Sequence, residues 1–123
     1  MTIEYSIEYT GSIIEVRLTG IPDRASITQM WTDIVAASEK HHCPLILGMT
    51  NLDRPMKLAV AIDHQAIFFE AGVTDKHRIA WVQLNPDAHS MTELAETILL
   101  NRGQFNGRLF TDEAEARRWL IPK

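Results

Sequence analysis

A short apolar strand followed by an amphipathic helix occurs four times along this chain, and this repetition constrains the fold more than any other feature. The last copy is the clearest. A strand at 108–110 is followed by a helix that begins at Asp112 and has Ala116, Trp119 and Leu120 on one face. Strands that are joined through helices pair in parallel, with right-handed crossovers. The repeats therefore predict an α/β sheet with helices packed against it.

The chain starts with a different pattern. Ile3, Tyr5 and Ile7 alternate with polar residues, a turn signal follows at 10–12, and residues 13–18 are again typical of a strand. Residues 3–19 therefore predict an antiparallel β-hairpin. The predicted architecture is a mixed five-stranded sheet, formed by this N-terminal hairpin and the βα repeats, in a single domain over residues 1–123.

Local signals set the expected boundaries between the hairpin and the last repeat. Capping boxes at 26–29 and 90–93 predict two helix starts, and Gly72 predicts the end of a helix over 56–71. Residues 44–49 and 78–84 predict two further strands. The run at 44–49 is continuously apolar, which is typical of a strand buried on both faces.

Composition excludes several classes of function. The net charge is −4 and the pI is about 5.7, so the chain lacks the basic surface typical of nucleic-acid binding. Its single cysteine, Cys43, cannot form an internal disulfide. Because we also find no secretory signal, we expect a cytoplasmic protein. No apolar run reaches the roughly 18 residues of a transmembrane helix, and no motif indicates a cofactor.

The element order, the strand at 78–82 and the ending at 108–120 together resemble the SpoIIAA-like family of bacterial domains, which is related to STAS and CRAL-TRIO lipid-transfer domains. The ending has the family's pattern of Phe, a short polar step, Glu-Ala and Trp-Leu. The resemblance covers nearly the whole chain. It implies a non-enzymatic regulatory or binding module, which acts through protein–protein contacts or a small apolar ligand.

One family mechanism does not match the residues present. In anti-anti-sigma members a phosphorylatable Ser follows an Asp in the loop after the third strand, whereas here Arg54 follows Asp53. A non-standard phospho-switch at Thr50 or Ser90 stays an alternative, because phosphate is tolerated at a helix start.

The loop over 51–56 is the predicted binding site. It follows a central strand, and open α/β sheets bind ligands at the carboxyl ends of their strands. Asn51, Asp53, Arg54 and Met56 supply its side chains. In the alternative interpretation, Asp53 only caps the next helix and Arg54 is solvated.

The helix expected over 56–71 is apolar on more than one face. One face of this helix packs on the sheet, so Phe68 or Phe69 on another face is free to contact an apolar ligand or a partner subunit. A homodimer is one such assembly. The alternative is a deeply buried central helix.

Other polar residues favour no specific chemistry. His41, His42 and Cys43 are adjacent and lack the spacing of metal ligands, so we predict no metal site. Asp63 and His64 are neighbours on a helix and do not face each other. A small enzyme with dispersed residues, using Asp53, Arg54 and His64, is the second hypothesis.

Overall fold

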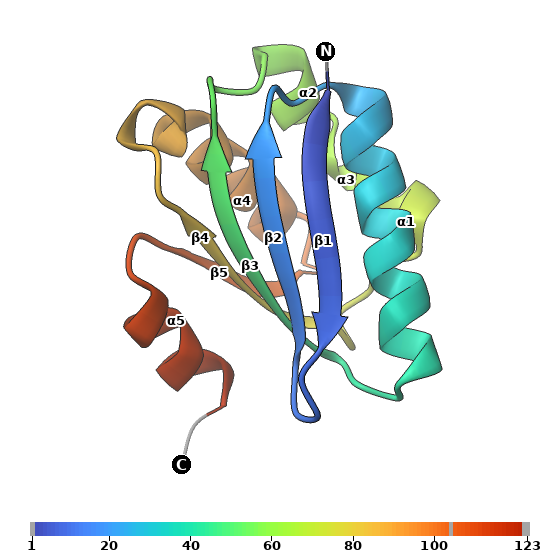
Figure 1. Cartoon of the computed structure of the whole chain (residues 1–123). Helices are drawn as coiled ribbons and strands as arrows, with labels where there is room; N and C mark the ends of the chain where they lie inside the picture. The colour runs from blue at the N-terminus through green and yellow to red at the C-terminus, as the bar shows by residue number, and fades with distance from the viewer. Residues whose placement is uncertain (1, 104, 122–123) are drawn as a thin grey trace.

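The computed structural model describes residues 2–103 and 105–121, and its centre is one five-stranded sheet (Figure 1). The strands lie side by side in chain order: β1 (Ile3–Tyr9), β2 (Ile14–Gly20), β3 (Leu45–Leu52), β4 (Arg78–Gln83) and β5 (Asn106–Phe110). The first pair is antiparallel and the other three pairs are parallel. The predicted hairpin and mixed five-stranded α/β sheet are confirmed.

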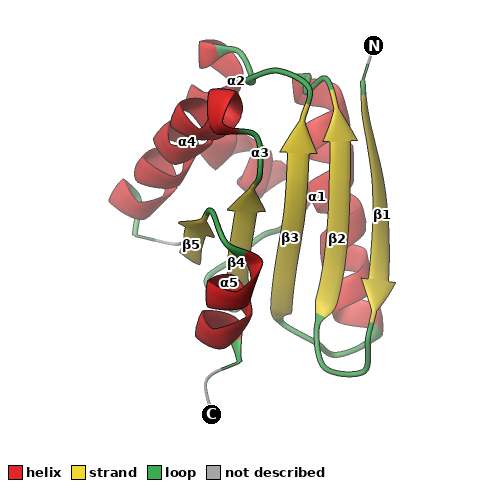
Figure 2. Ribbon diagram, turned by 60° about the vertical axis from the view of Figure 1, so that its left-hand side comes forward, coloured by secondary structure: helices red, strands yellow, loops and turns green. Residues whose placement is uncertain are grey.

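Five α-helices cover the two faces of the sheet unequally. They are α1 (Arg24–Lys40), α2 (Leu58–Ile62), α3 (His64–Ala71), α4 (His89–Asn101) and α5 (Glu113–Leu120), and the short 3₁₀ helix η1 (Pro86–Ala88) precedes α4. Figure 2 shows α5 alone on one face and the other four helices on the opposite face. In the described ranges, no helix combines the length and the apolar character that crossing a membrane requires.

The central strand β3 is buried on both faces, as its apolar run predicts. Ile46 belongs to the larger core, under α1, α3 and α4, and Leu47 belongs to the smaller core, under α5. Both side chains are fully buried. Since successive strand residues point to opposite faces, β3 separates two apolar cores.

Two helices begin earlier than the capping boxes predict. The N-cap of α1 is Asp23 and not Ser26, because the Asp23 carboxylate accepts a hydrogen bond of 2.8 Å from the backbone N–H of Ser26. Likewise α4 starts at His89, ahead of Ser90, because η1 leads directly into it. Asp and Ser are similarly good N-cap residues. The local sequence therefore did not show whether Asp23 or Ser26 caps α1.

The helix predicted over 56–71 is in fact two helices. It begins at Leu58, is interrupted at Asp63 and resumes at His64. Asp63 has φ −78° and ψ 1°, outside the α-helical region. The predicted stop at Gly72 is confirmed, because this glycine takes the left-handed conformation at φ 87°.

A glycine in β3 makes room for an aromatic ring. Gly48 pairs with Trp81 of β4, and a Cβ atom built on Gly48 would lie 2.0 Å from Cε3 of Trp81. The indole therefore lies directly on the β3 backbone, on the side of the larger core. This close approach requires glycine at position 48.

We predict that Gly48→Ala destabilises the protein by about 1–3 kcal/mol, the usual cost of overpacking, because the new methyl group displaces the Trp81 indole. The double variant Gly48→Ala/Trp81→Leu should lose less than the sum of the two single variants. Urea denaturation of the four proteins measures this coupling. Additive losses would show that the indole does not depend on Gly48.

Candidate functional site

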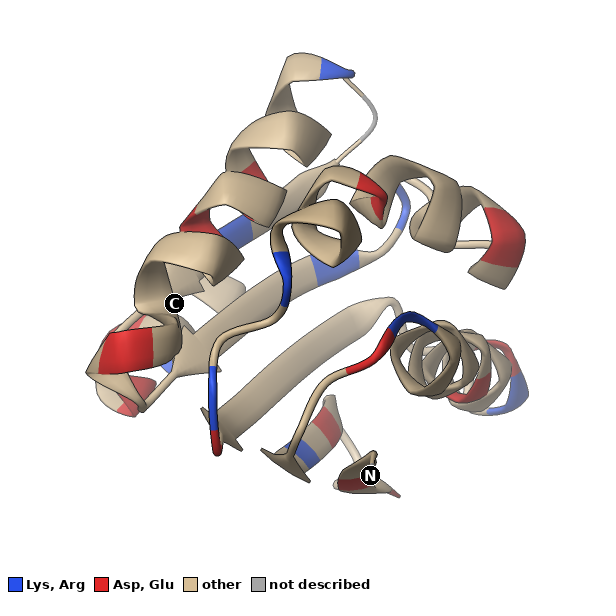
Figure 3. Ribbon diagram, turned by 90° about the horizontal axis from the view of Figure 1, so that it is seen from above, with Lys and Arg blue, Asp and Glu red and all other residues tan. Residues whose placement is uncertain are grey.

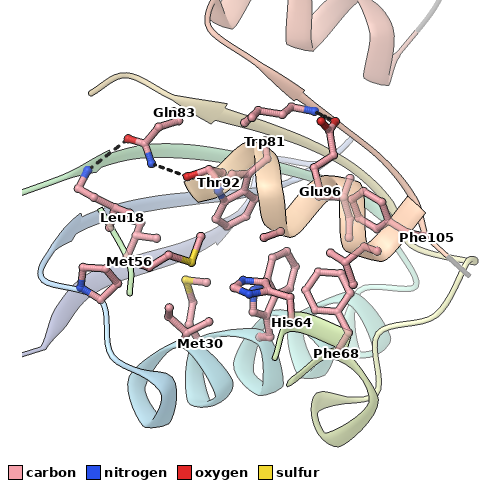
Figure 4. A pocket seen from close by; sticks show the side chains of 18 of the residues that line it. Leu18, Met30, Met56, His64, Phe68, Trp81, Gln83, Thr92, Glu96 and Phe105 are labelled. Atoms are coloured by element: carbon pink, nitrogen blue, oxygen red, sulfur yellow. Dashed lines mark hydrogen bonds between the residues drawn. The ribbon is translucent and has the colours of Figure 1, made fainter. Parts of the chain in front are cut away.

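A cavity lies between the sheet and helices α1, α3 and α4 (Figure 4). Its volume is about 70 Å³, which is room for roughly two water molecules. Buried side chains of α1 and β2 close one side, whereas half-buried Glu96 and Leu109 and exposed Arg108 border the other. We infer that the cavity opens at the edge between α4 and β5. Its apolar wall includes Leu18, Ile27, Met30, Trp31, Leu52, Met56, Phe68, Ile79, Trp81, Ala95, Leu99 and Phe105.

Aromatic rings form much of this wall. The ring of Trp31 lies 4.6 Å from that of Phe68 and 4.9 Å from that of Trp81, and Phe68 lies 5.8 Å from Phe105. These centroid distances and the tilted or edge-on geometries are favourable for aromatic pairs. Phe105 also lies against a glycine, since a Cβ atom on Gly107 would be 2.2 Å from its ring.

Three polar side chains of the wall are engaged in holding the fold. Gln83 accepts hydrogen bonds from the backbone N–H groups of Leu52 and Asn85, and its amide donates to the hydroxyl of Thr92. Thr92 in turn donates to the backbone carbonyl of Ala88, the last residue of η1. Glu96 accepts a 2.6 Å hydrogen bond from the backbone N–H of Leu109. These contacts join β3, β4, α4 and β5 around the cavity.

His64 is a further polar side chain of the wall, and it is different. Only 7% of it is exposed, its Nδ1 lies 2.9 Å from the carbonyl oxygen of Val60, and Figure 4 shows it pointing into the cavity. Burial lowers its pKa below the usual 6.5, although the nearby backbone carbonyls of Val60 and Ala61 and the charge of Asp63 act in the opposite direction. The ring is therefore neutral at physiological pH.

The structure divides the residues predicted for the binding site. Met56 and Phe68 line the cavity. Phe69 points away from it and is 86% exposed. Asn51 lies within β3, which extends to Leu52 and is longer than predicted, and it is exposed.

The two charged residues of the loop, Asp53 and Arg54, are exposed and do not line the cavity. Asp53 does not cap the next helix, because α2 has Lys57 at its N-cap position. Its backbone N–H instead donates to the carbonyl of Gly20.

The structure also shows where the residues named for the enzyme hypothesis and for the phospho-switch lie. Asp63 forms an ion pair of 3.2 Å with Arg24 and does not contact the imidazole of His64 through a hydrogen bond. Thr50 is fully buried, and its hydroxyl donates to the carbonyl of Val82. Ser90 is exposed. Among residues 2–103 and 105–121, no three His, Cys, Asp or Glu side chains form a group that could hold a metal ion.

In Figure 3, positions of Lys and Arg and positions of Asp and Glu both occur on several helices and strands of the ribbon. No model of a known protein family matches the chain, and no curated protein matches it. The cavity and its residues therefore carry the functional argument.

Sequence reasoning missed most of the cavity wall, which includes Trp31, Trp81 and Phe105. A local signal existed for two of these residues. Gly48 and Gly107 are glycines inside strands, a position that often marks the close approach of another group. The sequence named His64 only for an enzyme with dispersed residues, and no local signal placed it in a cavity wall, because the break in the helix at Asp63 was not predicted.

The adjacent residues Phe68 and Phe69 provide a matched pair for stability. We predict that Phe68→Ala lowers the free energy of unfolding by about 3–5 kcal/mol, the usual cost of removing a buried phenylalanine. Phe69→Ala should change it by less than about 0.5 kcal/mol, as is typical of surface positions. Chemical denaturation of both variants tests this. Similar losses for the two variants would contradict the orientation of α3.

The lowered pKa of His64 predicts a specific pH dependence. In the unfolded chain the imidazole of His64 binds a proton near pH 6.5, whereas in the folded protein its pKa is lower. The free energy of unfolding should therefore fall as the pH drops below about 7. The loss is at most about 1.4 kcal/mol per pH unit. Denaturation of wild type and His64→Phe between pH 7.5 and 5.5 measures it. The variant should lose less stability over this range, and an unchanged profile would contradict the assignment.

Proposed function

We propose that this chain is a non-enzymatic, STAS-like binding module whose ligand is a small apolar molecule. The observation that carries the proposal is the cavity, with its aromatic wall of Trp31, Phe68, Trp81 and Phe105. Binding sites for small molecules are typically concave and apolar, with a few well-placed polar groups.

The size of the cavity limits the ligand. Its volume of about 70 Å³ is roughly half that of an engineered cavity that encloses benzene. A single ring fits only if it projects into the opening or if neighbouring side chains move. Met30 and Met56 both line the cavity, and methionine is flexible enough to adapt to a ligand. The proposal is therefore restricted to molecules with about one ring, or to the end of a longer chain.

Two considerations support a binding role over catalysis. The resemblance to SpoIIAA-like domains implies a module without an active site. In addition, Gln83, Thr92 and Glu96 are hydrogen-bonded to other parts of the fold. A group held in this way is better suited to shaping a cavity than to transferring protons.

Toluene is the direct probe of this function. We predict saturable changes of the backbone amide resonances around the cavity when toluene is titrated into the protein. Ala95→Leu should abolish these changes, because Ala95 lines the cavity and the larger side chain fills it. Ala36→Leu, at an exposed position of α1, is the matched control and should bind as wild type does. If toluene causes no saturable change in wild type, the proposed function is wrong.

The outer face of α2 and α3 supports a second candidate function, contact with another protein. Leu58, Ile62 and Phe69 are exposed by 54%, 51% and 86%, and neighbouring large apolar side chains on a surface often mark an interface. The toluene titration separates the two functions. A module that acts only through this face has no need of a ligand in the cavity.

A further inference from the structure

We propose that His64 selects the ligand by accepting one hydrogen bond, so that the ligand is a neutral apolar molecule with a hydroxyl or N–H group. This inference rests on the proposed function and names its ligand class. Phenols and alcohols belong to this class. Pure hydrocarbons of the same size should bind more weakly, and carboxylates are disfavoured.

The contact with Val60 fixes the tautomer of His64. A carbonyl oxygen can only accept a hydrogen bond, so the ring nitrogen 2.9 Å away, Nδ1, must carry the proton. In a neutral imidazole the other nitrogen, Nε2, then has a free lone pair and acts only as an acceptor.

The free nitrogen faces the space where the ligand would lie. Among the described residues, every fully enclosed side-chain nitrogen or oxygen has a hydrogen-bond partner, whereas Nε2 has none among them. Nε2 therefore borders open space, although His64 is only 7% exposed. Since the side chain points into the cavity (Figure 4), that space is the cavity.

The surrounding groups define what Nε2 can bind. Most of the wall is apolar, the carboxylate of Glu96 accepts a hydrogen bond from the backbone of β5, and the only cationic side chain among the described lining residues, Arg108, is exposed at the border of the cavity. A ligand carboxylate would place its lone pairs against that of Nε2 and would lose its hydration. A ligand O–H or N–H would satisfy Nε2, which has no hydrogen-bond partner among the described residues.

Phenol and toluene provide the test, because they differ only by a hydroxyl and a methyl group. Both are titrated into the full chain with isothermal calorimetry, and the ¹⁵N resonance of His64 Nε2 is followed in parallel. We expect phenol to bind about tenfold more tightly than toluene, the size of one neutral hydrogen bond. Phenol should shift the Nε2 resonance, and toluene should leave it nearly unchanged.

His64→Phe removes the acceptor and keeps an aromatic ring. It should lose the preference for phenol and still bind toluene. His89→Phe is the matched control, because His89 does not line the cavity, and it should keep the preference. The ¹⁵N measurement uses only wild type and stays decisive if His64→Phe fails to fold.

The outcomes separate this inference from the proposed function. If both compounds bind equally and the Nε2 resonance does not move, the role of His64 is wrong and the apolar cavity stays the binding site. A phenol preference that survives in His64→Phe also overturns the role of His64. If neither compound binds, the inference and the proposed function are both wrong.

Discussion

The indole of Trp81 lies flat on the backbone of β3 because residue 48 has no side chain. This contact brings the ring within 4.9 Å of Trp31 on α1, whose ring packs in turn against Phe68 of α3. One glycine thus allows two helices and two strands to meet through aromatic rings. These rings form much of the wall of the cavity.

The break between α2 and α3 lies next to His64, one of the polar side chains of the cavity wall. His64 Nδ1 donates a hydrogen bond to the carbonyl of Val60, four positions earlier in the chain. In a continuous helix, the backbone N–H of residue 64 would donate to that same carbonyl. One nitrogen of a buried imidazole is thereby satisfied by the helix itself, and the ring is held in a fixed orientation. The break and the open acceptor are therefore two results of one local arrangement.

The sequence predicted the elements that depend on local patterns. The buried stripe of α1, the two-sided burial of β3 and the left-handed Gly72 all follow from spacing or residue type. The break at Asp63 was not predictable, because the apolar pattern of 56–71 is compatible with one continuous helix. The site was predictable only in part. Met56 and Phe68 were expected and line the cavity, whereas most of its wall comes from residues that are distant in the sequence and meet only in the fold.

The surroundings of His64 bear on the proposal that the cavity binds a ligand and does not transfer protons. A neutral imidazole with a lowered pKa resembles a general base, but such a base needs a partner within hydrogen-bond reach. Asp63 is paired with Arg24, and Glu96 holds the backbone N–H of Leu109. Asp53 and Arg54 lie outside the cavity wall. Among the described residues, Nε2 of His64 has no hydrogen-bond partner and can therefore accept a hydrogen bond from a ligand. A single fixed acceptor among apolar rings can recognise a donor group, and recognition requires no second titratable residue.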